Sequence, residues 1–233
     1  MQRARLWFIV GAVLCLGSIS ANGNPATFSR FTTGNKSVAY EIFEEKVTGP
    51  ILILLHGASG PDVPLYRQQA QFFAANGYTV LLLHYFDATG SSQPSDRNYS
   101  TWVRAIQDLM HECKGNPKWT DRRIALIGFS LGASVALAAG SQRVPVGAIA
   151  DWYGSLPDAF FAQRKGMPPL LILHGMRDPV IPIINAQQLA RLCDMEHQTC
   201  ESHFYADQGH GFAGDALKDA DARTLDFFAR RLK

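Results

Sequence analysis

The chain has 233 residues, which is enough for one sizeable domain and short for two. Apolar residues make up 47% of it and charged residues 18%, a balance that is typical of a globular protein and excludes a wholly disordered chain. The formal net charge is only +2 at pH 7, and no basic run lies outside the extreme N-terminus, which excludes the charge pattern of a nucleic-acid-binding protein.

The N-terminus has the pattern of a secretory signal peptide. Arg3 and Arg5 precede an uncharged apolar run, LWFIVGAVLCLGSI, and small residues follow it. This run is shorter than the roughly 20 residues that span a bilayer. We therefore predict a signal peptide over residues 1–21 that is cleaved after Ala21. The mature protein is expected to be exported, periplasmic or secreted, with no stable membrane insertion.

Strands and a helix are predicted in the segment that follows. Residues 28–33 and 37–43 indicate two short strands joined by a Gly-Asn turn. The continuous apolar runs at 51–56 and 79–85 are too short for helices and indicate strands buried on both faces. The segment between these runs carries apolar residues at helical spacing and a closing glycine, namely Tyr66, Ala70, Phe73 and Gly77.

The second half of the chain continues this alternation. A long amphipathic helix with Ser100 as its N-cap presents an apolar face of Trp102, Ile106, Leu109, Met110 and Cys113. Further strands are predicted over 124–129, 146–153, 170–175 and 201–206, and further helices over 131–140, 185–193 and 217–232. Alternating strands and helices indicate a parallel sheet covered by helices on both faces. The prediction is one α/β domain over residues 22–233.

Three polar residues follow predicted strands and are candidates for chemistry. They are Ser130, within GFSLG, then Asp178 and His210. Functional residues gather at the carboxyl ends of parallel strands, and the order Ser, Asp, His is that of the α/β-hydrolase arrangement. A serine hydroxyl is a weak nucleophile that needs a neighbouring base, for which an imidazole is suited near neutral pH. The Asp178 carboxylate would orient that imidazole, with Asp151 as the alternative acid.

A nucleophilic serine also requires donors for the charge that develops on the substrate oxygen. The backbone N–H groups of Leu131 and Ala58 are the candidates for this oxyanion hole. Aromatic residues at the strand ends either line an apolar cleft or belong to the core, and they are Tyr85, Phe86, Trp152, Tyr153 and Phe212. Histidines at other strand ends are interpreted as loop hydrogen-bonding residues, namely His56, His84 and His174. No spacing in the sequence indicates a metal site.

The cysteines bear on the expected compartment. Cys193 and Cys200 are close in sequence, and an oxidising compartment would let them form a disulfide. Cys113 lies on the apolar face of a predicted helix and is expected to be a buried free thiol.

Several motifs in combination resemble the dienelactone hydrolase family of α/β-hydrolases. The resemblance covers residues 37–231 and is carried by LLHGASG, YRQQAQFFAANGYTVLLLHYFDATG, IGFSLGAS, DWYGS, PLLILHGMRDPVIP and YADQGHGF. It implies the α/β-hydrolase fold, with a mostly parallel twisted sheet of about eight strands, and no cofactor. It also implies that Ser130, Asp178 and His210 are nucleophile, acid and base, with Leu131 and the HGASG loop at the oxyanion.

Two departures from the family narrow the expected substrate. The namesake enzyme has a cysteine nucleophile where this chain has Ser130, which favours ordinary ester hydrolysis. The namesake also carries an arginine shortly after the histidine, whereas Gly214 stands near that point here. Such an arginine would hold a substrate carboxylate in a bidentate pair.

The sequence thus predicts an exported serine hydrolase that cleaves small carboxylic esters or lactones through an acyl-enzyme. A peptidase or thioesterase with the same triad is the alternative among enzymes. A binding protein that kept the fold without the chemistry is the alternative from another class. The expected partner is a small-molecule substrate, and the sequence does not distinguish a monomer from a homodimer.

Overall fold

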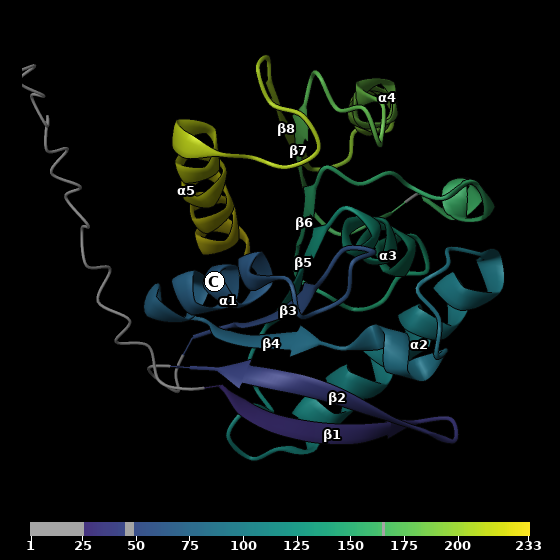
Figure 1. The fold of residues 1–233 in the computed structure, drawn as a ribbon, viewed down its shortest axis with the longest axis vertical. Coiled ribbons are helices and arrows are strands. Elements are labelled where there is room, and N and C mark those ends of the chain that lie inside the picture. The colour runs from purple at the N-terminus through teal and green to yellow at the C-terminus, as the bar shows by residue number, and fades with distance from the viewer. Residues whose placement is uncertain (1–25, 45–48, 165) are drawn as a thin grey trace, which may run out of the picture.

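The computed structural model describes residues 26–44, 49–164 and 166–233 (Figure 1). The expected signal peptide over residues 1–21 lies outside them. The strands are β1 (Thr27–Thr33), β2 (Lys36–Phe43), β3 (Ile51–Leu55), β4 (Thr79–Leu83), β5 (Ile124–Phe129), β6 (Ile149–Trp152), β7 (Leu170–Gly175) and β8 (Cys200–Tyr205). The helices are α1 (Pro64–Ala75), α2 (Asp96–Gly115), α3 (Leu131–Ser141), α4 (Ile183–Met195) and α5 (Gly214–Arg231), with short 3₁₀ helices η1 (Tyr85–Ala88) and η2 (Asp158–Gln163).

The described strands form one eight-stranded sheet in the order β1-β2-β4-β3-β5-β6-β7-β8. β1 and β2 pair antiparallel, as do β2 and β4, and every later pair is parallel. This confirms the predicted α/β class and the mostly parallel sheet. The chain passes from β3 to β4 on one side and later to β5 on the other. Because these central strands are parallel, their carboxyl ends lie along the same end of the sheet.

Helices cover both faces of the sheet. α1 and α5 lie on one face, and α2, α3 and α4 lie on the other (Figure 1). Each face has its own apolar core, and every residue of β3, β4 and β5 is buried between them. Burial on both faces explains why these strands are continuous apolar runs rather than alternating ones.

Some boundaries differ from the sequence-based prediction. Ser95, not Ser100, is the N-cap of α2, and its hydroxyl accepts the Asn98 N–H at 3.2 Å. Ser100 lies one turn inside the helix, where its hydroxyl donates to the Asp96 carbonyl oxygen. Both serines precede the apolar face of the helix in the sequence. The earlier one is the N-cap because the polar turn that begins at Asp96 is already helical.

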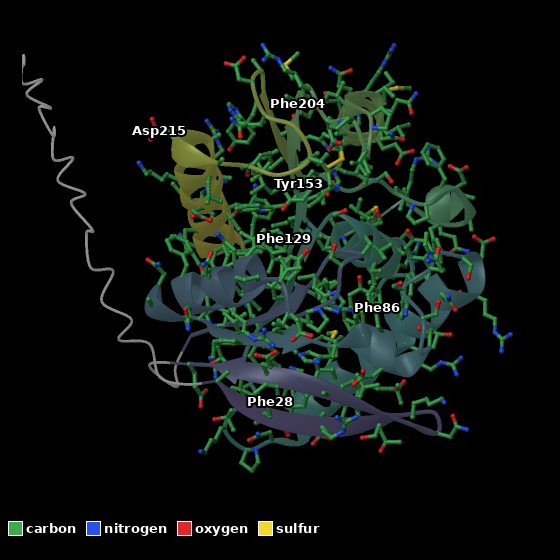
Figure 2. All side chains as sticks on the ribbon, in the orientation of Figure 1. Phe28, Phe86, Phe129, Tyr153, Phe204 and Asp215 are labelled. Atoms are coloured by element: carbon green, nitrogen blue, oxygen red, sulfur yellow. A yellow bond between two sulfur atoms is a disulfide. The ribbon has the colours of Figure 1, made fainter. Side chains whose placement is uncertain are left out.

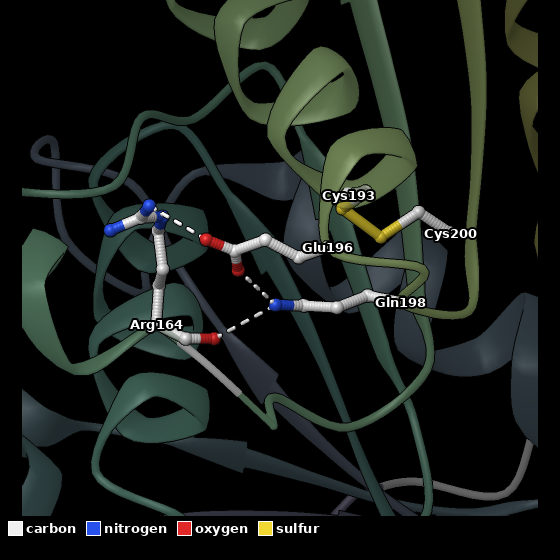
Figure 3. The surroundings of a disulfide bond; sticks show 5 residues. All are labelled: Arg164, Cys193, Glu196, Gln198 and Cys200. Carbon is white, nitrogen blue, oxygen red and sulfur yellow. Dashed lines mark hydrogen bonds and ion pairs between the residues drawn. A yellow bond between two sulfur atoms is a disulfide. The ribbon is translucent and has the colours of Figure 1, made fainter.

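The disulfide between Cys193 and Cys200 ties the end of α4 to the start of β8 (Figure 3). Beside it, the Arg164 guanidinium donates to Glu196 at 2.7 Å, and Gln198 donates to the other oxygen of the same carboxylate at 2.7 Å. The bridge and the ion pair therefore hold in place residues 193–200, most of whose side chains are exposed or only partly buried.

Cys113 is a buried free thiol, as predicted, and burial raises its pKa to about 12.

Within the described part of the chain, no helix combines the length and hydropathy needed to cross a bilayer.

Candidate active site

Ser130 stands on a sharp turn between β5 and α3. Its backbone has φ 55° and ψ −118°, a left-handed conformation that non-glycine residues rarely adopt. The Ser130 N–H donates to the Trp152 carbonyl oxygen at 3.0 Å, and its own carbonyl oxygen accepts the Ser134 N–H at 3.1 Å. Bonds to both the sheet and the helix hold the residue in this strained conformation, which lifts its side chain out of the sheet.

The glycines on either side of Ser130 allow α3 to approach the sheet closely. A Cβ on Gly132 would lie 2.1 Å from the Leu55 carbonyl oxygen and 2.5 Å from that of His56. A Cβ on Gly128 would lie 2.4 Å from the Gly132 carbonyl oxygen. All of these are backbone atoms that cannot turn away, so the turn requires glycine at both positions.

Ser130, His210 and Asp178 form a continuous hydrogen-bonded line. His210 Nδ1 lies 2.8 Å from Asp178 Oδ2, and His210 Nε2 lies 2.7 Å from Ser130 Oγ. A carboxylate only accepts hydrogen bonds, so Nδ1 carries the imidazole proton and Nε2 is left to accept from the serine hydroxyl. The sheet brings these residues together from positions 130, 178 and 210, each after the carboxyl end of a different strand.

Asp178 is fixed by bonds from two directions. Its Oδ1 accepts the N–H groups of Val180 at 2.8 Å and Ile181 at 2.9 Å, while Oδ2 faces His210. Burial acts to raise the pKa of Asp178, but the hydrogen bonds from His210, Ile181 and Val180 outweigh it and hold that pKa below its usual value. The carboxylate is therefore ionised at neutral pH and oriented toward the imidazole.

The other histidines at strand ends have structural partners. His174 Nε2 donates to the Ile181 carbonyl oxygen at 2.8 Å and lies 3.2 Å from Asp178 Oδ2. His56 Nδ1 lies 2.9 Å from the Gly57 carbonyl oxygen, and His84 Nε2 lies 2.9 Å from Glu41 Oε1. Over the described residues, no group of histidine, cysteine and acidic side chains is placed to hold a metal ion.

Asp151, the alternative acid, has a different partner. It is fully buried at the end of β6, and its Oδ1 accepts the Gly154 N–H at 2.8 Å. Burial raises its pKa to about 7, with the Gly154 hydrogen bond acting in the opposite direction. The carboxyl that contacts His210 is that of Asp178, and Asp151 instead braces the turn after β6.

The two backbone groups expected at the oxyanion lie beside Ser130. Leu131 is the first residue of α3, so its N–H has no partner within the helix. Ala58 lines the same cavity as Ser130, and no acceptor for its N–H is found in the described chain. The Gly57 N–H, one residue earlier, is occupied because it donates to the Tyr66 hydroxyl at 2.9 Å.

A cavity of about 570 Å³ opens over Ser130 and His210. Its lining residues are Gly57, Ala58, Ser59, Leu65, Tyr66, Ser130, Tyr153, Val180, His210, Gly211, Phe212 and Ala213. The lining is thus mainly apolar, and neither a lysine nor an arginine of the described residues belongs to it. A larger hollow of about 810 Å³ lies around the amino end of β5, away from Ser130.

The expected pocket aromatics divide into two groups. Tyr153 and Phe212 line the cavity, and the Tyr153 ring meets the His210 ring edge-on at 5.2 Å between centroids. Tyr85, Phe86 and Trp152 do not line it. Figure 2 shows Phe86 beside α2 and Tyr153 farther along the sheet toward α5.

The three aromatics that do not line the cavity have partners in the core, which was the alternative expected from the sequence. The Tyr85 hydroxyl donates to the His56 carbonyl oxygen at 2.7 Å, and the Phe86 ring packs on Trp102. Trp152 Nε1 donates to the Thr224 hydroxyl under α5 at 3.1 Å. A position at a strand end therefore does not determine whether an aromatic ring lines the cavity or belongs to the core.

Tyr66 is a cavity residue that the sequence did not single out. Its spacing with Ala70 and Phe73 was sufficient to place it on the buried face of α1, which the structure confirms. The one feature of the sequence that could have indicated a functional role is the hydroxyl of Tyr66, because a phenylalanine would fill a purely apolar position equally well.

Comparison with known proteins agrees with this fold. The model of the dienelactone hydrolase family matches residues 38–230. A dienelactone hydrolase from Anabaena variabilis superposes with a TM-score of 0.76 at 17% identity, covering 90% of this chain and 99% of that one. An esterase from Pyrococcus furiosus does so with 0.72 at 17% identity, covering 90% and 92%. A dienelactone hydrolase-like promiscuous phosphotriesterase from metagenomic libraries has a TM-score of 0.75 at 15% identity, with coverage of 90% and 99%. No curated protein matches the sequence.

Proposed function

The chain belongs to the dienelactone hydrolase family, and is thereby a hydrolase of the carboxylic ester hydrolase kind; from this we propose that it cleaves small esters or lactones through an acyl-enzyme formed on Ser130. The observation that carries the proposal is the hydrogen-bonded line from Ser130 through His210 to Asp178. It supports an activated serine because the imidazole atom facing the hydroxyl is the unprotonated one.

The proposed acylation step uses each of these groups once. Ser130 Oγ forms a bond to the substrate carbonyl carbon, the carbonyl π electrons move onto oxygen, and His210 Nε2 takes the hydroxyl proton. The backbone N–H groups of Leu131 and Ala58 hold the resulting oxyanion. The oxyanion then reforms the carbonyl, the ester C–O bond breaks, and His210 returns its proton to the departing alkoxide oxygen.

Deacylation repeats the sequence with water. Water gives its proton to His210 Nε2 as its oxygen adds to the acyl carbon, and Ser130 leaves with the proton returned. Throughout, the Asp178 carboxylate stabilises the imidazolium and fixes its orientation. In a lactone the departing alkoxide is part of the same molecule, so one hydroxy acid is released.

The lining of the cavity supports a small, neutral substrate. Leu65, Val180 and Phe212 offer apolar contacts to an acyl or alkyl group. No cationic side chain among the described lining residues is available to pair with a substrate carboxylate, which agrees with Gly214 standing where the namesake has an arginine.

The disulfide supports the further proposal that the protein is exported. Disulfides persist in oxidising compartments and are rare in the cytosol of most organisms. The proposal is tested by expressing the full chain in a bacterial host and sequencing the N-terminus of the recovered protein. A start after Ala21 in the periplasmic or culture fraction is expected, whereas an intact N-terminus in the cytosol would contradict it.

The proposed nucleophile is tested by turnover of 4-nitrophenyl esters with short acyl chains. We expect Ser130→Ala to lose roughly 10³-fold or more of kcat/KM, because no other group on the turn replaces the hydroxyl. Ser141→Ala, on the same helix and remote from the cavity, serves as the matched control and should retain activity. Full turnover by Ser130→Ala would overturn the mechanism, and equal rates on matched anilides would favour the peptidase alternative.

A further inference from the structure

We propose that the Tyr66 hydroxyl is a catalytic hydrogen-bond donor that stabilises the oxyanion formed when Ser130 attacks the substrate. The inference rests on the proposed function and adds a side-chain donor to the N–H groups of Leu131 and Ala58. A phenol hydroxyl next to the nucleophile has the chemistry for this role, since it donates a hydrogen bond without becoming charged itself.

The Tyr66 hydroxyl lies close to Ser130. Tyr66 lies in the first turn of α1 and lines the cavity together with Ser130 and His210. A Cβ placed on Gly57 would lie 2.7 Å from the Tyr66 hydroxyl oxygen and 3.4 Å from Ser130 Cβ. The Tyr66 hydroxyl and the Ser130 side chain therefore both lie next to Gly57, on the same side of the cavity.

The Tyr66 hydroxyl accepts one hydrogen bond and retains a proton to donate. Its oxygen accepts the Gly57 N–H at 2.9 Å, and a phenol that accepts one bond still has a proton to donate. No acceptor for that proton is found among the described residues. By contrast, the Tyr85 hydroxyl donates to the His56 carbonyl oxygen and the Tyr205 hydroxyl donates to Asp219. The Tyr66 proton is therefore free to point into the cavity, and the Gly57 N–H fixes the oxygen from which it does so.

The Tyr66 side chain is held rigidly by its surroundings. The neighbouring Arg67 donates from two nitrogens to the two oxygens of Glu41, each at 2.8 Å, and the Glu41 side chain is 1% exposed. This pair clamps the first turn of α1 to β2. The Tyr66 ring also packs against Phe129, the residue before Ser130, at 5.6 Å between centroids. A donor held in advance requires no rearrangement when the charge develops.

The hydroxyl is protonated under working conditions. Burial raises the pKa of Tyr66, and the hydrogen bond from Gly57 offsets this only in part. The titratable groups that share the cavity with it are Tyr153, whose pKa burial also raises, and His210. Tyr66 can thus donate across the neutral and mildly alkaline range.

Deletion of the hydroxyl is the first test. We expect Tyr66→Phe to lower kcat for a 4-nitrophenyl ester about 10²-fold with little change in KM, because the bond strengthens only as charge develops. The affinity for an aryl trifluoromethyl ketone, which forms a tetrahedral adduct with the serine, should fall by a similar factor. Tyr78→Phe removes a hydroxyl before β4, outside the cavity, and should leave both measurements unchanged.

A second variant separates donation from a merely structural role as acceptor of the Gly57 N–H. Replacement of Tyr66 by trifluorotyrosine makes the phenol more acidic, so it ionises within the range in which the wild type is active. An ionised phenolate cannot donate a hydrogen bond, so if Tyr66 is a donor, kcat should fall at higher pH in this variant alone. If Tyr66 only accepts the Gly57 N–H, ionisation would strengthen that bond and kcat should not fall. Unchanged kcat in Tyr66→Phe, or a fluorinated variant with the wild-type pH profile, would overturn the inference. If the wild type neither hydrolyses esters nor labels on Ser130, the proposed function itself fails and this inference falls with it.

Discussion

Nδ1 of His210 lies 2.8 Å from Oδ2 of Asp178, a contact that joins a loop after β8 to a loop after β7. The contact fixes which imidazole nitrogen carries the proton, and so leaves the other nitrogen to receive one from Ser130. It depends on the parallel pairing of β7 with β8, which brings two residues 32 positions apart to the same edge of the sheet.

Replacement of Asp178 by asparagine tests this contact. The asparagine amide can donate to Nδ1, which would place the imidazole proton on Nε2 and remove the acceptor for the Ser130 hydroxyl. We expect kcat to fall on the order of 10³–10⁴-fold while the protein stays folded. Ester turnover and circular dichroism provide the measurements. Asp194→Asn on the exposed side of α4 is the control, and equal activity in the two variants would contradict the assigned role.

The buried Asp151 makes stability depend on pH. Its pKa is raised to about 7 in the folded protein, so its contribution to stability is complete below the ordinary aspartate pKa and is lost as pH rises through about 7. Asp151→Asn keeps an oxygen for the Gly154 N–H but cannot ionise.

Urea unfolding of both proteins at pH 5 and pH 8 measures this effect. Relative to the variant, the wild type should lose about 2–3 kcal/mol of unfolding free energy between the two pH values. The contributions of the other titrating groups to the unfolding free energy are the same in both proteins and cancel in the difference. A difference that does not change with pH would show that Asp151 is already ionised in the folded state.

A methyl group on Gly132 should be strongly destabilising. It would lie 2.1 Å from the Leu55 carbonyl oxygen, so α3 or β3 would have to move. We expect Gly132→Ala to cost roughly 2 kcal/mol or more, or to prevent folding. Gly115→Ala, at the end of α2 with no atom within 4 Å of its added carbon, is the control and should stay within about 0.5 kcal/mol of wild type. Thermal melts of the two variants distinguish these outcomes, and equal melting temperatures would refute the close approach.

The Cys193–Cys200 bridge closes a short loop and should contribute modestly to stability. For a sequence separation of 7, the chain-entropy model gives about 2–3 kcal/mol. The double variant Cys193→Ser/Cys200→Ser should therefore melt about 5–10 °C below wild type. A reductant should shift the wild type toward the variant and leave the variant unchanged. A wild type that melts at the same temperature with and without reductant would contradict a stabilising bridge.

The sequence was most informative where one physical factor dominates. β5 and β7 begin and end at the predicted residues because each begins with an apolar run and is followed by a turn. β6 was predicted over 146–153 but spans only Ile149–Trp152, because apolar residues also occupy the connection that packs before it. Apolar composition alone does not distinguish a strand from a buried connection.

The catalytic residues of the site could be predicted from the sequence more fully than the residues that line its cavity. The order of Ser130, Asp178 and His210 at strand ends was enough to expect their convergence. Whether Tyr85, Phe86 and Trp152 line the cavity or belong to the core depends on their packing partners, such as Trp102 and Thr224, which are distant in sequence. The contact of Tyr66 with Gly57 could not be foreseen for the same reason, since it depends on how α1 docks beside the loop after β3.

The most direct test of the central claim is the reaction of the purified protein with a fluorophosphonate probe, with the modified residue mapped by mass spectrometry. We expect a single adduct on Ser130, greatly diminished in His210→Ala and retained in His111→Ala on α2. No adduct on Ser130 in protein shown to be folded, or undiminished labelling in His210→Ala, would contradict a serine activated by His210.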